Sequence, residues 1–185
     1  MFFFPAGVTF EDNTLRMKTI LFAAALFFAG TAFGQEPLVT RDANGHKVVR
    51  GFMTQQELAS DTAFSWYGRN ISGFTPDAAA VQAFKNKKDN IHIIAFGGTW
   101  CEDTQNLLPK FFALANASGF PAERVTLLGV DLEKKAVQHF SEALGVTRVP
   151  TFIVMKDGKE VGRVVEWGKY GQPDKELGEI VSSIK

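Results

Sequence analysis

The chain has 185 residues, with 20 Lys and Arg against 20 Asp and Glu, so its formal net charge is zero. A chain without net positive charge has no net electrostatic attraction for a polyanion, so nucleic acid is not an expected partner. The single cysteine forms no intramolecular disulfide, and it falls short of the several thiolates of most structural zinc sites. Hydrophobic residues make up 45% of the chain, which indicates a globular domain with an apolar core.

The start of the chain predicts a cleavable export signal that begins at a second methionine, Met17. Lys18 supplies a positive charge, residues 20–29 form an unbroken apolar run, and small residues at positions 32 and 34 mark a cleavage site before Gln35. The run is shorter than the roughly 20 residues that cross a bilayer, so no membrane anchor is expected after cleavage. A buried N-terminal helix is the alternative, and it is disfavoured because the run has no polar face.

This interpretation divides the first 34 residues into two parts. Residues 1–16 are expected to be an artefact of the start-codon choice, and residues 17–34 are expected to be the signal peptide. The mature protein, which begins at Gln35, is then expected to be periplasmic or secreted.

Residues 35–74 form an N-terminal extension with the patterns of a hairpin and a short helix. Asn44-Gly45 lies between two β-compatible segments and predicts a β-hairpin. Thr54 and Glu57 have the spacing of a capping box and predict a helix start. Three aromatic residues either pack onto the domain that follows or line a groove for a partner: Trp66, Tyr67 and Phe74.

From Thr75 to Lys185 the sequence predicts alternating helices and strands. The expected elements are a helix from Thr75-Pro76-Asp77 to Lys87 with Pro76 at its first helical position, a strand over 91–96, a helix through 107–115, a strand over 125–130, a helix over 134–144, a strand over 151–155, an Asp157-Gly158 turn into a strand over 160–166, and a helix from Pro173 to Lys185. This order predicts an α/β fold in which a central mixed sheet is flanked by helices.

One group of residues carries recognisable chemistry, and it is Trp100-Cys101-Glu102-Asp103-Thr104. The group follows a predicted strand and a Gly97-Gly98 break, at the point where a helix begins. A thiol placed there lies at the positive end of the helix, and open α/β folds bind ligands at the carboxyl ends of their strands.

These residues belong to an ordered set that resembles the thioredoxin family over residues 75–185. The set consists of Trp100-Cys101, Pro109 eight residues after the cysteine, Val149-Pro150-Thr151 as the family's cis-proline loop, and residues 156–159 (Lys-Asp-Gly-Lys) as its hairpin turn. The chain looks most like exported thioredoxin-like proteins with W-C-x-D-[ST] in place of W-C-x-x-C. The resemblance implies a thioredoxin-like fold and chemistry at Cys101.

Three positions depart from the family pattern. Thr104 stands where the family has its second, resolving cysteine, so this chain cannot cycle through an internal disulfide. Ala95 and Leu127 stand where the family has a buried acid and a lysine. Because both members of that pair are apolar together, no buried charge is left without a partner.

Two functions follow from this pattern. In the first, the protein is a monothiol oxidoreductase in which Cys101 attacks a protein or peptide disulfide, Thr104 and Arg148 stabilise the thiolate, and an outside thiol, such as a low-molecular-weight one, releases the product. The resemblance further implies that the substrate is bound by Trp100, Arg148 and Val149-Pro150. In the second, the fold is a non-redox binding module for a peptide or partner protein, and Cys101 is a small buried apolar residue.

The remaining charged residues and histidines are weaker candidates for a functional site. Glu102 and Asp103 oppose the effect of the helix end on the thiol, because they compete for the same positive charge. The three histidines, at positions 46, 92 and 139, have no ligand spacing among them, so neither a metal nor a cofactor is expected.

Overall fold

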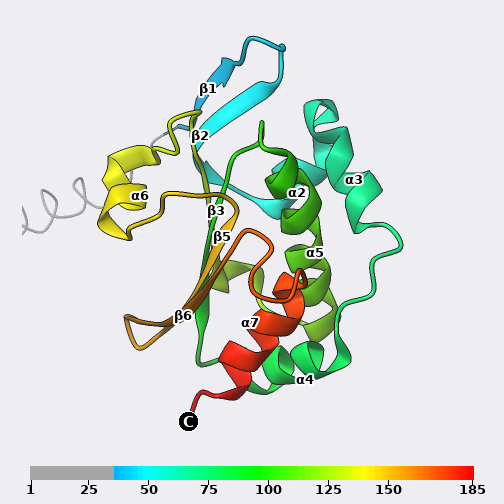
Figure 1. Ribbon diagram of the computed structural model, residues 1–185. Helices are drawn as coiled ribbons and strands as arrows, with labels where there is room; N and C mark the ends of the chain where they lie inside the picture. Colours follow the sequence, from blue (N-terminus) through cyan, green and yellow to red (C-terminus); the bar gives the residue numbers. More distant parts are fainter. Residues whose placement is uncertain (1–35) are drawn as a thin grey trace, which may run out of the picture. The chain divides into compact units, whose positions relative to one another are not determined.

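Six strands form one mixed sheet in the order β1-β2-β4-β3-β5-β6 in the computed structural model, which describes residues 36–185 (Figure 1). β3 and β4 run parallel, and the other neighbouring pairs are antiparallel. The predicted mixed sheet with an N-terminal extension is therefore confirmed. The strands are β1 (Leu38–Arg41), β2 (Lys47–Met53), β3 (His92–Gly97), β4 (Val125–Gly129), β5 (Thr151–Lys156) and β6 (Lys159–Val165).

Helices cover both faces of this sheet. One core cluster joins the sheet to α2, α3, α4, α5 and α7, and a second cluster on the opposite face involves α6 and the residues before it (Figure 1). The helices are α2 (Gln55–Ser60), α3 (Ser65–Ile71), α4 (Ala78–Lys87), α5 (Glu102–Ser118), α6 (Phe140–Ala143) and α7 (Pro173–Ser182), with 3₁₀ turns η1 (Thr62–Phe64), η2 (Ala122–Arg124) and η3 (Val137–His139).

The extension joins the same sheet. The predicted hairpin is present, with β1 paired to β2, and Gly45 has a φ of +82° in the connecting loop. The predicted capping box is also present, since Thr54 accepts from the Glu57 N–H and the Glu57 side chain accepts from the Thr54 N–H. Trp66 and Tyr67 are buried in the larger core, so these two aromatic residues pack onto the domain. Residues 36–185 thus form one compact unit.

Two helix predictions were wrong in position. α4 begins after Pro76, because the Asp77 carboxylate accepts from the Ala80 N–H and makes Asp77 the N-cap. α7 ends at Ser182, short of the predicted Lys185.

The helix predicted over 134–144 is reduced to η3 and the four residues of α6. Lys134, Gln138 and His139 have positive φ values, which an α-helix does not allow. The Lys135 carbonyl accepts from the Asp131 N–H, and the Ala136 carbonyl accepts from the Arg50 guanidinium, so neither carbonyl forms the i→i+4 bond of a helix.

The predicted start-codon segment and export signal, residues 1–34, lie outside the described residues. Among residues 36–185, none of the helices combines the length and the apolar character that a membrane crossing requires.

Candidate functional site

Cys101 lies between the carboxyl end of β3 and the start of α5, as the sequence predicts. β3 ends at Gly97, and the Cys101 N–H closes a turn by donating to the Gly98 carbonyl at 2.9 Å. Cys101 is the N-cap of α5, and its side chain is partly buried. The thiol is thus held next to the unpaired N–H groups of the first turn of a long helix.

The thiol contacts the loop that precedes β5. The Cys101 S–H donates to the Val149 carbonyl at an Sγ–O distance of 3.5 Å. The Val149–Pro150 peptide is cis. Val149 is buried, and its N–H has no acceptor within residues 36–185. The structure therefore brings together three predicted site residues, Cys101, Val149 and Pro150. The N–H of Val149 is an unpaired backbone donor beside them.

Trp100 forms one wall of the turn that carries the thiol. Its indole N–H donates to the Val130 carbonyl at 3.2 Å, and the Lys134 ammonium lies 5.8 Å from the ring centroid. The ring lies so close to Gly98 that a Cβ atom there would come within 2.8 Å of it. This contact explains why a glycine is needed in the turn.

Thr104 is placed differently from the prediction. Its side chain is fully buried, and its hydroxyl accepts from the Gly98 N–H at 3.2 Å. The expected hydrogen bond to the Cys101 thiol is not formed. Thr104 is the third residue of α5, and from this position its hydroxyl reaches the turn at Gly98. The hydrogen bond satisfies a buried backbone N–H and stabilises the turn.

Arg148 precedes Val149, and its side chain is turned toward the segment that follows β6. Its guanidinium lies at the surface and donates to the Glu166 carboxylate at 2.9 Å. The Glu166 backbone N–H in turn donates to the Pro150 carbonyl at 2.7 Å. The cis-proline loop is thus tied to the segment that follows β6.

Sequence reasoning missed Trp167, which follows β6 and is 39% exposed. Its indole N–H donates to the Asp103 carboxylate at 2.9 Å, and the Lys110 ammonium lies 5.4 Å from its ring. The two hydrogen-bonded residues are 64 positions apart. The available signal was a tryptophan directly after the predicted strand over 160–166, but no local sequence pattern identifies its partner.

The three histidines lie apart from this site and from one another. His92 bonds the Thr126 hydroxyl at 2.8 Å, and burial, aided by the nearby Arg124 charge, holds the pKa of His92 below its ordinary value. His46 pairs with Asp42 in the hairpin loop. Within residues 36–185, no three His, Cys, Asp or Glu side chains gather in a way that would hold a metal ion.

Comparison with known proteins gives the class of this fold and site. The thioredoxin family profile matches residues 77–177, which is more than half of the chain. The chain therefore belongs to the thioredoxin family, whose members act on thiols and disulfides of protein substrates.

Individual relatives and one solved structure are similar to parts of this chain. Thioredoxin from Echinococcus granulosus is 35% identical over 85 residues, which cover 46% of this chain and 74% of the relative. An H-type thioredoxin from Chlamydomonas reinhardtii is 36% identical over 85 residues, with 45% and 71% covered. The structure of Fasciola hepatica thioredoxin is 28% identical with a TM-score of 0.38, covering 56% of this chain and 89% of that one.

Proposed function

We propose that this protein carries out thiol–disulfide exchange as a monothiol, with Cys101 as the attacking group. The Cys101 thiolate attacks one sulfur of a partner disulfide, a new S–S bond forms, and the other sulfur leaves as a thiolate. Cys101 is the only cysteine, so no second thiol of this chain can attack the mixed disulfide. An outside thiol, from a protein or a low-molecular-weight compound, therefore has to release the partner.

The observation that carries this proposal is the placement of Cys101 in a thioredoxin-family domain. The thiol is partly accessible, and it lies against the Val149 carbonyl at the start of α5. The unpaired Val149 N–H and this carbonyl can pair with the backbone of an extended peptide beside the thiol. A peptide bound at Val149-Pro150 then lies with its backbone beside the Cys101 sulfur.

The other predicted residues support this step indirectly. Thr104 holds the Gly98 turn in place, and Trp100 packs on the same turn. Arg148 and Glu166 form a charged pair on the substrate side of Pro150, where they contact the flanks of a bound peptide.

The proposal includes export. Residues 17–34 carry the pattern of a signal peptide, so the mature chain begins at Gln35 and acts in the periplasm or outside the cell. Expression of the full sequence in a bacterium, followed by mass measurement of the periplasmic and cytoplasmic protein, tests this part. A cytoplasmic product that keeps residues 17–34 would contradict it.

The deciding experiment on function is the alkylation rate of Cys101 at pH 7 in the folded chain and in the same chain unfolded by denaturant. We expect faster alkylation in the folded chain, together with a mass-detected mixed disulfide when a peptide disulfide is added. The double variant Cys101→Ser, Asn116→Cys is the matched control, because it moves the thiol to an exposed position near the other end of α5. Alkylation of Cys101 no faster than in the unfolded chain would overturn the proposal. In that case, peptide binding that survives Cys101→Ala would favour the binding module.

A further inference from the structure

The hairpin of the extension ends the sheet with an uncovered edge. β1 is the outermost strand, all four of its residues are exposed, and nothing within residues 36–185 pairs with its outer side. In an antiparallel pair, every second residue of β1 points its N–H and C=O away from β2. Leu38 and Val39, at 57% and 49% exposure, add apolar surface to this edge. Such an edge is a template for another extended chain.

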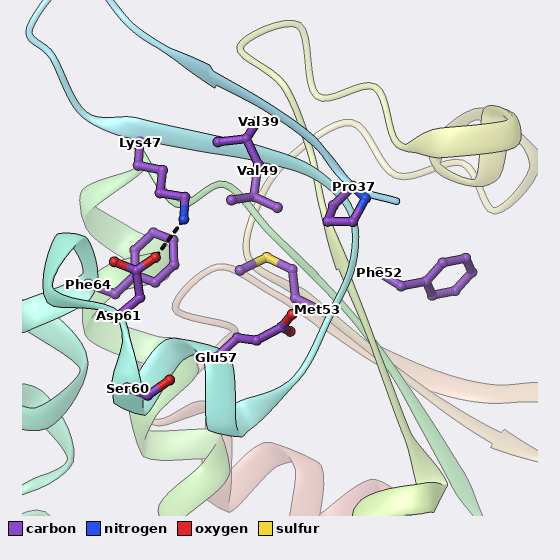
Figure 2. Close-up of a pocket in the computed structure, with 10 residues that line it drawn as sticks. All are labelled: Pro37, Val39, Lys47, Val49, Phe52, Met53, Glu57, Ser60, Asp61 and Phe64. Atoms are coloured by element: carbon purple, nitrogen blue, oxygen red, sulfur yellow. Dashed lines mark hydrogen bonds and ion pairs between the residues drawn. The ribbon is translucent and has the colours of Figure 1, made fainter. Parts of the chain in front are cut away.

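Two pockets flank this edge, one on each face of the hairpin. Val39 and its cross-strand partner Val49 line a pocket of about 180 Å³ between the hairpin and α2, with Met53 and Phe64 also in its wall (Figure 2). On its polar rim, Lys47 and Asp61 form an ion pair at 2.5 Å, and the Glu57 carboxylate accepts from the Thr54 N–H and hydroxyl. This pocket suits an apolar side chain.

The pocket on the opposite face is polar. Thr40 and its partner Val48 border a space of about 360 Å³ whose other lining residues are Leu132 and four charged residues. Its charged residues include the pair formed by Arg50 and Asp131 and the pair formed by Glu133 and Lys135. Because successive side chains of a strand point to opposite faces, a chain added to β1 would present alternate residues to an apolar and to a polar pocket.

We propose that the outer edge of β1 is a docking site for an extended segment of a partner polypeptide with alternating apolar and polar residues. The segment adds as a further strand and places its apolar side chains at the Val39 pocket. A second copy of this chain fits less well, because its own edge strand, Leu38-Val39-Thr40-Arg41, has two apolar residues followed by two polar ones and does not alternate. The proposal is independent of the chemistry of Cys101.

Hydrogen bonds connect the hairpin that carries the β1 edge to the turn of residues 98–101, which carries the thiol. The Thr99 hydroxyl donates to the Lys47 carbonyl at 2.7 Å and accepts from the Val49 N–H at 3.3 Å. Thr99 therefore links β2 to the turn two residues before Cys101. A polypeptide bound at β1 is held by the same hairpin that is attached to this turn.

The test uses the full chain and a fluorescent synthetic peptide in which leucine alternates with threonine between flanking lysines. We expect saturable binding tighter than about 1 mM, lost when alternate backbone amides of the peptide are N-methylated. Val39→Asp should weaken binding at least about tenfold, because it puts a charge at the apolar pocket. Val161→Asp is the matched control, since Val161 is an exposed valine on β6, the other edge strand.

Three outcomes would overturn the proposal. The first is the absence of saturable binding at about 1 mM peptide. The second is equal weakening by Val39→Asp and Val161→Asp, which would show attachment without preference for β1. The third is self-association of the chain that Val39→Asp abolishes while the peptide does not bind, which would make a second copy the occupant.

Discussion

Ala95 on β3 and Leu127 on β4 are direct partners in the parallel pairing of the two central strands, and both are buried. The resemblance to the thioredoxin family places an acid and a lysine at these two positions. In this protein, two apolar side chains therefore pack where a buried proton-transferring pair would otherwise lie. The pairing in the sheet explains why the two replacements go together, because either charge alone would be buried without a partner.

Ala95→Asp should destabilise the fold. The new carboxylate would face Leu127 in the core, and an uncompensated buried charge costs about 3–5 kcal/mol. Chemical denaturation of the full chain measures this cost. Ala117→Asp, at an exposed position of α5, is the control and should cost less than about 1 kcal/mol. The double variant Ala95→Asp, Leu127→Lys should recover part of the loss, and an Ala95→Asp chain as stable as the control would contradict this account.

Tyr67 should make the fold sensitive to alkaline pH. Burial raises the pKa of Tyr67 to about 12, and the Gln55 side chain offsets only part of this effect. The unfolded chain releases the phenol proton near pH 10 while the folded chain keeps it, so stability falls as the pH rises from 10 towards 12. The loss from this group is about 2 kcal/mol.

Tyr67→Phe tests this linkage by denaturation at several pH values. The variant should lose less stability than the parent chain between pH 10 and pH 12, and at pH 7 the two should agree within about 1 kcal/mol, because the contact of the buried hydroxyl with the Gln55 side chain falls short of hydrogen-bond geometry. Tyr170 is the only other tyrosine and is exposed, so Tyr170→Phe should leave the alkaline loss unchanged. Identical pH profiles for the parent and Tyr67→Phe would refute the linkage.

Features with a local physical cause could be predicted from the sequence. The hairpin follows from Asn44-Gly45, and the start of α2 follows from the reciprocal bonds of Thr54 and Glu57. The position of Cys101 follows in the same way, because the glycines at 97 and 98 end the strand and the helical spacing resumes directly after the cysteine.

Features that depend on side chains from distant parts of the chain could not be predicted. Arg148 pairs with Glu166, and Trp167 donates a hydrogen bond to Asp103. Each contact joins residues that are distant in the sequence, so no local sequence pattern predicts it. The helix expected over 134–144 failed for a related reason. Its apolar spacing was suitable, but the carbonyls of residues 135 and 136 accept from Asp131 and Arg50 instead of from the next helical turn.

Asp103→Asn should accelerate alkylation of Cys101 at pH 7. The Asp103 carboxylate lies in the first turn of α5, where its negative charge opposes a thiolate at the N-cap. Its removal should raise the rate about two- to fivefold, in line with the effect of one charge at a helix end. The asparagine oxygen can still accept from the Trp167 indole, so the loop contact is kept. Asp89→Asn, which removes a carboxylate close to the start of β3, is the control. Slower alkylation of Cys101 in Asp103→Asn than in the parent chain would contradict the prediction.

Thr104→Cys should convert the monothiol into a dithiol that resolves its own adduct. Residues at the N-cap and third helical positions are neighbours, as in a capping box, so a cysteine at 104 can reach the Cys101 sulfur. With an aromatic disulfide that releases a coloured thiol, the parent chain should release one equivalent and keep the other as an adduct. The variant should release a second equivalent more slowly than the first, because Ala95 provides no acid to assist deprotonation of the second thiol. Thr104→Ser should behave like the parent chain, and a Thr104→Cys chain that stops at one equivalent with a stable adduct would show that the two positions do not meet.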